Sequence, residues 1–289
     1  MKNHPSACTE FSENQINALI LLLSDQDPKI AQTIHNQLVG IGQPAIPFLQ
    51  RALSKQDSSN LSDRILAVIS DIKLIEVEHM FQALTAPSNE SIDLEEGAFL
   101  IAHAAYPDLD SLAYQQQIEN MVNVLKQRWE PNITPRQAIQ LINEYLFHEL
   151  GFKGNTQDYY DPDNSFLHKV LERRVGIPIS LCVLYLLIGQ RLNVPVVGLG
   201  LPGHFMVGLR AEPVFIDCFN QGVVLNQKEV AKFLEEYGVE FDSRHLTPTP
   251  NELILARMIR NLLAIYEKRN EPQQAKRFSK LLAYLEPSD

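Results

Sequence analysis

The residue types that could do chemistry gather between positions 155 and 220. Ser180 and Cys182 lie in the first turns of an apolar segment, His204 opens a predicted strand and Asp217 lies on the next one. A nucleophile at a helix N-terminus, a His and a carboxylate, in that order, form a nucleophile–base–orienter arrangement. The helix dipole would favour negative charge on the nucleophile. The order predicts that Asp217 holds the tautomer of His204 and that His204 deprotonates Ser180 or Cys182.

The two nucleophile candidates exclude each other. Ser180 and Cys182 are two residues apart, which is roughly 200° around a helix, so they cannot face one cavity. If Ser180 faces His204, Cys182 points into the core as a small packing residue. Ser180 is also interpreted as a capping residue of its helix. Asp217 needs a partner if it is buried, and that partner is either His204 or a turn.

A polar loop before the apolar helix supplies further candidates. The segment 151–165 is rich in Gly, Asn, Asp and Pro, and loops of this length are often functional. One interpretation is the rim of a pocket, and the other is a turn braced by Asx hydrogen bonds. Arg174 ends a compact charged triplet that either braces the fold or binds a ligand. The predicted pocket residues are Asn155, Tyr160, Asn164, Arg174 and Gly203.

These residues must be positioned by helices and a few strands. Hydrophobic spacing predicts helices around 16–23 and over 29–39, 45–53, 61–75, 93–105, 111–129, 135–147, 166–173, 179–192, 227–237, 251–268 and 272–285. Strands are predicted over 194–199, 204–210 and 214–218, the last two as an antiparallel hairpin. The helix over 179–192 is apolar nearly all round, which is typical of a central buried helix.

Composition limits the classes of function. The 289 residues carry a net charge of −10 with a pI near 5.3, which argues against nucleic-acid binding and against adhesion to anionic membranes. No apolar run reaches the length of about 20 residues that spans a bilayer. Three scattered cysteines, one of them Cys8 in a predicted N-terminal tail, suit a reducing compartment. We expect a cytoplasmic protein with no cofactor and no metal site.

Several separated motifs resemble the SirB-type transglutaminase-like family, within the papain-type cysteine hydrolases. They read DLEEGAFLIA, GNTQDYYDPDNSFLHKVLERRVGIPISL, RLNVPVVGLGLPGHFMVGL and FIDCFNQG, in that order. The resemblance implies a mostly helical α+β fold: a transglutaminase-like core whose small antiparallel sheet packs on a central buried helix, flanked by helical repeats. We expect a HEAT-like segment over 1–90, the transglutaminase-like domain over 91–245 and a tetratricopeptide-like hairpin over 246–289.

The resemblance places the nucleophile at position 179 or 180 rather than at Cys182. The favoured hypothesis is therefore a non-catalytic or weakly catalytic binding or regulatory module that keeps a pocket around His204 and Asp217. The alternative is a cysteine or serine hydrolase or acyl transferase that acts on amide bonds of peptides or proteins. A purely structural scaffold is the third hypothesis. A protein or peptide partner is expected, and the oligomeric state is left open.

Overall fold

The computed structural model describes residues 11–55, 59–86, 91–210, 212–236 and 238–286. Their contacts divide the chain into two compact units, residues 1–79 and 80–289. Each unit is described by itself. The predicted division into three domains stays a prediction, and Cys8 lies outside the described residues.

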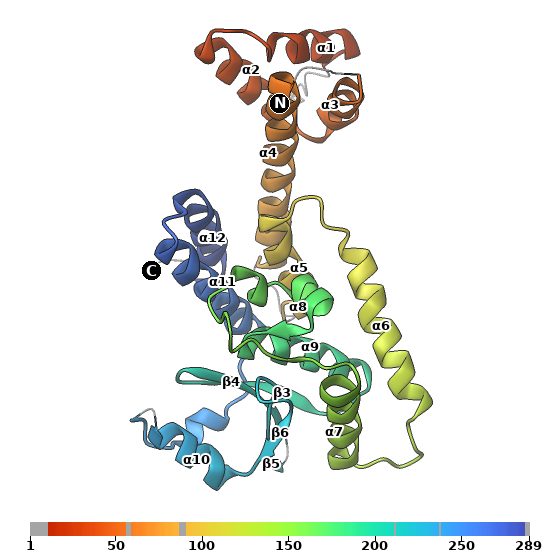
Figure 1. Cartoon of the computed structure of the whole chain (residues 1–289), viewed down its shortest axis with the longest axis vertical. Helices are drawn as coiled ribbons and strands as arrows, with labels where there is room; N and C mark the ends of the chain where they lie inside the picture. Colours follow the sequence, from red (N-terminus) through yellow and green to blue (C-terminus); the bar gives the residue numbers. More distant parts are fainter. Residues whose placement is uncertain (1–10, 56–58, 87–90, 211, 237, 287–289) are drawn as a thin grey trace, which may run out of the picture. The chain divides into compact units, whose positions relative to one another are not determined.

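The first unit is built of helices whose ends are marked in the sequence (Figure 1). Ser12 forms a capping box with Gln15, and Asp27 caps the next helix ahead of Pro28. These caps satisfy backbone N–H groups that the helix itself cannot pair. The elements are α1 (Glu13–Leu22), α2 (Pro28–Ile41), the 3-10 turn η1 (Gln43–Ala45), α3 (Ile46–Leu53) and most of α4 (Ser59–Leu84).

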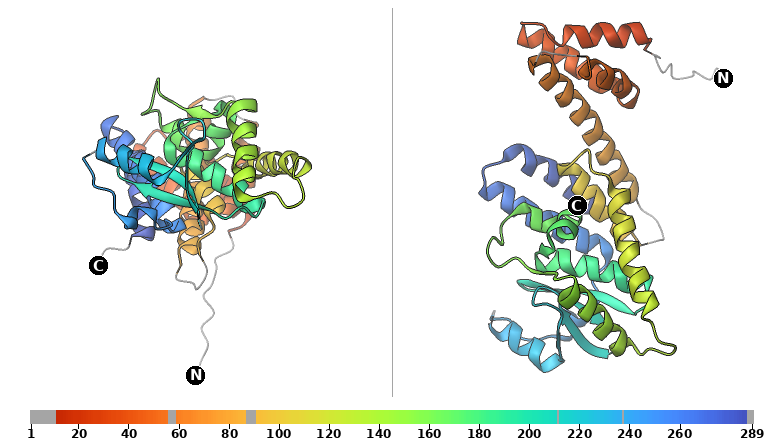
Figure 2. Two further views of the ribbon diagram at one scale, coloured as in Figure 1. Left: turned by 90° about the horizontal axis from the view of Figure 1, so that it is seen from below. Right: turned by 45° about the vertical axis from the view of Figure 1, so that its right-hand side comes forward.

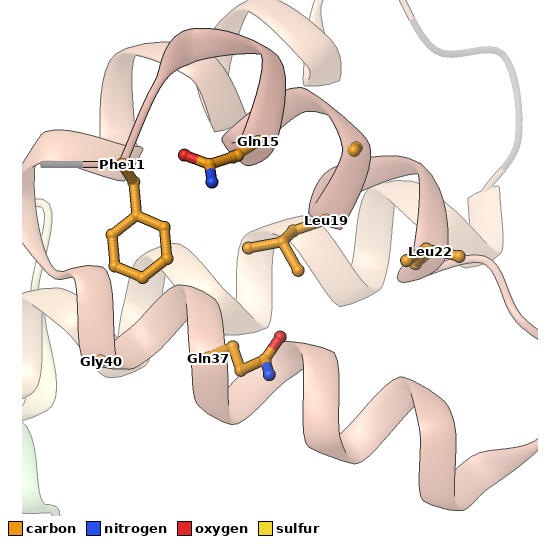
Figure 3. A pocket seen from close by; sticks show the side chains of 7 residues that line it. Phe11, Gln15, Leu19, Leu22, Gln37 and Gly40 are labelled. Atoms are coloured by element: carbon orange, nitrogen blue, oxygen red, sulfur yellow. The ribbon is translucent and has the colours of Figure 1, made fainter. Parts of the chain in front are cut away.

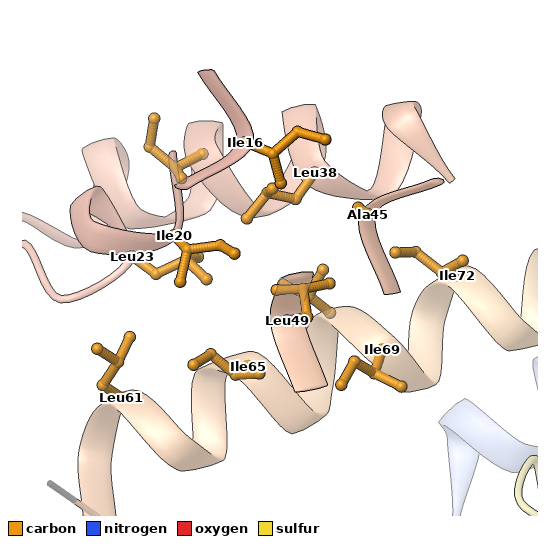
Figure 4. Packing of buried hydrophobic residues seen from close by; sticks show 12 residues of the cluster. Ile16, Ile20, Leu23, Leu38, Ala45, Leu49, Leu61, Ile65, Ile69 and Ile72 are labelled. Carbon is orange, nitrogen blue, oxygen red and sulfur yellow. The ribbon is translucent and has the colours of Figure 1, made fainter. Parts of the chain in front are cut away.

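One apolar cluster joins these helices. From the helix predicted around 16–23, Ile16, Ile20 and Leu23 are buried against Leu38 of α2 and Leu49 of α3 (Figure 4). A groove of about 500 Å³ lies over α1 and α2, lined by Phe11, Gln15, Ala18, Leu19, Leu22, Gln37 and Gly40 (Figure 3). The HEAT-like character of this unit remains a prediction.

The second unit begins with helices that the sequence predicted well. Asp93 caps α5, and Thr134 forms a capping box with Gln137 at the start of α7. The elements before the sheet are α5 (Leu94–Ala105), α6 (Ser111–Gln127), α7 (Pro135–Asn143), a π-helical turn η2 (Glu144–Glu149), β1 (Lys153–Gly154), η3 (Pro162–Ser165), α8 (Leu167–Arg173) and β2 (Val175–Gly176). β1 lies inside the region 151–165 predicted as loop and forms a short parallel pair with β2, which follows α8.

A four-stranded antiparallel sheet follows the apolar helix α9 (Pro178–Arg191). Its strands are β3 (Val196–Leu201), β4 (His204–Leu209), β5 (Glu212–Asp217) and β6 (Val223–Leu225), paired in sequence order. The predicted hairpin of the second and third strands is confirmed. The sequence did not predict β6, which is only three residues long and half exposed.

The sheet lies between two helical layers (Figure 1). α9 packs on one face through β3 and β4, and α10 (Gln227–Glu236) covers the other through Val230 and Leu234. Helices α5, α6, α8 and α11 (Asn251–Lys268) surround the far side of α9, and α11 pairs with α12 (Pro272–Leu285) (Figure 2). α9 is therefore the central buried helix. The mostly helical α+β fold with a small sheet on a central helix is confirmed.

Candidate functional site

His204 is placed by a tight turn between two strands. Gly203 adopts a positive φ of 71°, a conformation that costs glycine little, and it lets β4 start directly after β3. Leu201 and His204 face each other across the turn as the last pair of the ladder. Arg257 of α11 donates from Nη2 to the carbonyl oxygens of both residues, at 3.0 and 2.7 Å. The predicted pocket residue Gly203 thus shapes the turn that carries His204.

Asp217 lies against His204 at the end of β5. Nε2 of His204 is 3.0 Å from Oδ1 of Asp217, an ion-pair distance, although the ring N–H is not aligned for a hydrogen bond. Asp217 also accepts from the backbone N–H groups of Phe219 and Asn220 and, at 2.8 Å, from the Asn220 amide. The two expected partners of this carboxylate, a histidine and a turn, are both present.

Asp217 keeps its negative charge in this environment. Burial alone would raise the pKa of the carboxyl, since only 4% of the residue is exposed. His204 and the hydrogen bonds from Asn220 act in the opposite direction and hold the pKa below its ordinary value. The charged carboxylate therefore lies 3.0 Å from the ring of His204, a residue that is itself only 7% exposed.

The sheet separates this pair from the helix that carries the predicted nucleophiles. Alternate strand residues face opposite sides of a sheet. Leu201, Met206 and Phe215 pack in the cluster under α10, so His204, paired with Leu201, and Asp217, two residues after Phe215, share that face. α9 packs on the other face.

Ser180 is committed to the backbone at the start of α9. Its Oγ accepts from the N–H of Ile177 at 3.1 Å and lies 2.6 Å from the carbonyl oxygen of Asn164. A Cβ at Gly176 would meet this Oγ at 2.7 Å, so the hydroxyl is tightly enclosed. Ser180 occupies the third helical position and caps Ile177. This hydrogen bond to the N–H of Ile177 fits the interpretation of Ser180 as a capping residue of its helix.

Cys182 is fully buried on α9. Its Sγ lies 3.4 Å from the carbonyl oxygen of Phe205, and the thiol of Cys218 lies beside it. Burial, followed by the contact with Cys182, raises the pKa of the Cys218 thiol. In the part of the chain that the structure describes, no hydrogen bond joins His204 to Cys182 or to Ser180.

The loop before α8 is organised by Asn164, which is completely buried. Its side-chain amide donates to the carbonyl oxygens of Asp158 and Tyr159, and its Oδ1 accepts from Asn155. Its backbone carbonyl accepts from Ile177 and from Ser180. Asn155 and Asn164 therefore tie the polar loop to the start of α9, as the braced-turn interpretation predicts.

The other predicted pocket residues lie toward the surface. Tyr160 is 58% exposed, with the Lys268 ammonium 4.3 Å from its ring centroid. Arg174 takes a left-handed conformation at the end of α8 and donates to the carbonyl oxygen of Leu150. Its neighbour Arg173 pairs with Asp161 at 2.7 Å. The charged triplet thus makes internal contacts.

An aromatic cover, defined as Tyr159, Phe219 and Phe233, lies over the pair. The ring centroids of Phe233 and Phe219 are 5.2 and 6.4 Å from that of His204, and Tyr159 meets Phe219 edge-on at 5.9 Å. The cover comes from three elements: the polar loop, the turn after β5, and α10. It explains why the polar pair is so little exposed.

Sequence reasoning did not select four residues of this region. Asn220 could have been found from the Asp-x-x-Asn spacing, which is typical of an Asx turn. Phe219 and Phe233 carry no signal beyond being aromatic, and Arg257 is one of three cations in α11. Among the described residues no cluster of three His, Cys, Asp or Glu could hold a metal ion. A search of the same residues finds no helix suited to crossing a membrane.

The sequence is similar to a known protein family and to several bacterial proteins. The Transglutaminase-like superfamily model matches residues 112–260. A UPF0162 protein of Xylella fastidiosa (strain 9a5c) is 35% identical over 217 residues, 72% of this chain and 77% of the relative. A UPF0162 protein of Vibrio cholerae serotype O1 is 24% identical over 205 residues, 69% and 76% of the two chains.

A eukaryotic protein shares part of the match. F-box only protein 21 of Homo sapiens is 34% identical over 152 residues, which is 47% of this chain and 23% of that protein. No solved structure gives a significant match. The matched span includes Ser180, His204, Asp217 and Arg257, and thus the whole candidate site. By the family match and by its UPF0162 relatives, the chain belongs to the transglutaminase-like superfamily.

Proposed function

We propose that this chain is a non-catalytic or weakly catalytic binding module with a transglutaminase-like fold. Its ligand site is centred on His204 and Asp217, and its partner is a protein or peptide. The proposal keeps the fold of an amide-bond enzyme and assigns the histidine and the aspartate to recognition and to structure.

One observation carries this proposal: the nucleophile candidates and the base lie on different sides of the sheet. Cys182 points at the backbone of Phe205, and the Ser180 hydroxyl is engaged by Asn164 and Ile177. A general base must come within hydrogen-bond reach of the proton it removes. Such a contact would require α9 to rotate in a tightly packed core, where small shifts are costly.

Thiol labelling tests the proposal, with Cys218 as the internal control. The folded protein is treated with iodoacetamide at neutral pH, and labelled peptides are identified by mass spectrometry. Cys182 and Cys218 are both buried, so we expect both to react slowly and at similar rates. Rapid labelling of Cys182, lost in His204→Ala, would show a His-activated thiolate and would overturn the proposal.

The alternative function is amide hydrolysis or acyl transfer. The observation in its favour is the buried ion pair between His204 and Asp217, which matches a base and its orienting carboxylate. Hydrolysis of a peptide amide by the full chain, abolished by both His204→Ala and Ser180→Ala while the fold persists, would support a serine enzyme. We expect no such hydrolysis.

A further inference from the structure

Arg257 is a half-buried cation that pairs with no carboxylate in the described part of the chain. It lies on α11 between the buried residues Ala256 and Met258. Its guanidinium donates to two carbonyl oxygens and lies over the Phe205 ring, whose centroid is 5.5 Å from the guanidinium carbon. Buried charges in proteins are normally paired. Burial lowers the pKa of this guanidinium, which still remains charged at neutral pH.

Only part of its hydrogen-bonding capacity is used. Arginine has five N–H donors in a planar fork. Nη2 spends its two hydrogens on Leu201 and His204, whereas Nη1 and Nε, here called the free edge of Arg257, bond to no described residue. Nη1 lies 3.4 Å from where a Cβ of Gly200 would be, and Gly200 is exposed. The free edge is therefore next to solvent.

The free edge is close to the candidate site. The same guanidinium donates to the carbonyl oxygen of His204 at 2.7 Å, and the nearby Tyr159 hydroxyl acts to raise the pKa of the guanidinium, against the larger effect of burial. Tyr159 belongs to the aromatic cover. Phe205 and Gly200 face the α9 side of the sheet, opposite the His204 imidazole, so a ligand group at the free edge would lie at the turn that carries His204 rather than against the imidazole itself.

We propose that the free edge of Arg257 binds the carboxylate of a peptide ligand at the β3–β4 turn that carries His204. This inference rests on the proposed binding function and names the ligand chemistry. A guanidinium fork fits a planar carboxylate through two parallel hydrogen bonds. One cation on a chain of net charge −10 favours a singly charged anion over a phosphate dianion. The adjoining aromatic side chains suit an apolar residue next to that carboxylate.

The test uses the full chain and matched small probes in ligand-observed NMR titrations. N-acetylphenylalanine carries an α-carboxylate, and N-acetylphenylalaninamide is its uncharged counterpart. The acid should bind at least about tenfold more tightly than the amide, because a charge-assisted bidentate contact is lost in the amide. N-acetylglutamic α-amide, with only a side-chain carboxylate, shows whether a chain terminus or an acidic side chain is the preferred source.

Two variants locate the effect. Arg257→Gln should bring acid and amide within about twofold of each other. Arg260 lies about one turn further along α11, is exposed and pairs with Glu286. Arg260→Gln should therefore keep the wild-type preference for the acid over the amide. Thermal unfolding of each variant checks that the fold persists, and the acid–amide comparison on the unaltered chain needs no variant.

Three outcomes would overturn the inference: equal binding of acid and amide, tighter binding of inorganic phosphate than of the acid, or an equal loss in Arg260→Gln. Each of these leaves the labelling of Cys182 unaffected. Rapid labelling of Cys182 would instead remove the proposed function while the carboxylate preference could still be measured. The two failures are therefore distinguishable.

Discussion

Replacing Ser180 by alanine tests whether its hydroxyl stabilises the fold or is free to act as a nucleophile. The Ser180 Oγ accepts one hydrogen bond, from Ile177, and donates its single hydrogen to the nearest carbonyl oxygen, that of Asn164. Each such bond contributes about 0.5–1.5 kcal/mol to stability, so Ser180→Ala should cost about 1–3 kcal/mol. The Ile177 N–H keeps a 3.3 Å bond to Asn164, which prevents a larger loss.

Ser165 provides the matched control. It is equally buried, but its Oγ has no hydrogen-bond partner within the described part of the chain. Removing an unsatisfied buried hydroxyl costs nothing or stabilises slightly, so Ser165→Ala should change the free energy of unfolding by less than about 0.5 kcal/mol or raise it.

Urea unfolding followed by fluorescence measures both variants. Trp129 is the single tryptophan and lies in the second unit, so its signal reports on the part of the chain that contains both serines. The expected difference of about 2 kcal/mol corresponds to a Tm difference of roughly 4–8 °C for a unit of this size. Equal stability of the two variants would refute the hydrogen-bond reasoning and return Ser180 to the list of free nucleophiles.

Two further predictions concern buried positions of the same unit. His168 is enclosed by Tyr106, Tyr114 and Phe166, and burial, aided by the Lys169 charge, lowers its pKa to about 4. Because the unfolded chain takes up this proton first, stability should fall as the pH drops from about 6.5 to about 4. In urea unfolding, His168→Phe should reduce this loss of stability at low pH, whereas His148→Gln, at an exposed position, should leave it unchanged. Gly222→Ala should destabilise the unit by about 1–3 kcal/mol more than Gly238→Ala. Both glycines have φ near +70°, but the new Cβ at position 222 would lie 2.4 Å from the Phe147 ring and the one at 238 meets nothing within 4 Å. Equal melting temperatures of the two variants would contradict the packing argument.

Elements with clear local signals were predictable. Both ends of α11 and α12 match the prediction, and Asp93 and Thr134 cap the helices predicted over 93–105 and 135–147. α4 extends beyond the predicted end because Val77 and Phe81 continue its buried stripe. The π-helical turn over 144–149 has no local signal, since its extra residue is stabilised by packing.

The site was predictable in part. The order of His204 and Asp217 on neighbouring predicted strands indicated that the two residues form a pair. The helical spacing of Ser180 and Cys182 indicated that their side chains point in different directions. Which sheet face each strand residue occupies depends on register and on the position of α10. A single sequence does not contain that information. Arg257 is separated from His204 by 53 positions, and only the packing of α11 brings them together.

The aromatic cover makes events at His204 slow to start. Only 7% of His204 is exposed, and the Phe233 and Phe219 rings lie 5.2 and 6.4 Å from its ring, so we expect the arrival of protons and ligands at the imidazole to depend on movement of the cover. Ring and loop motions of this kind in packed surroundings take nanoseconds to milliseconds, much longer than a collision with water. Proton exchange at the ring and ligand arrival would then pass through one gate. Their rates should share one temperature dependence, and raising the ligand concentration should bring the association rate to a plateau.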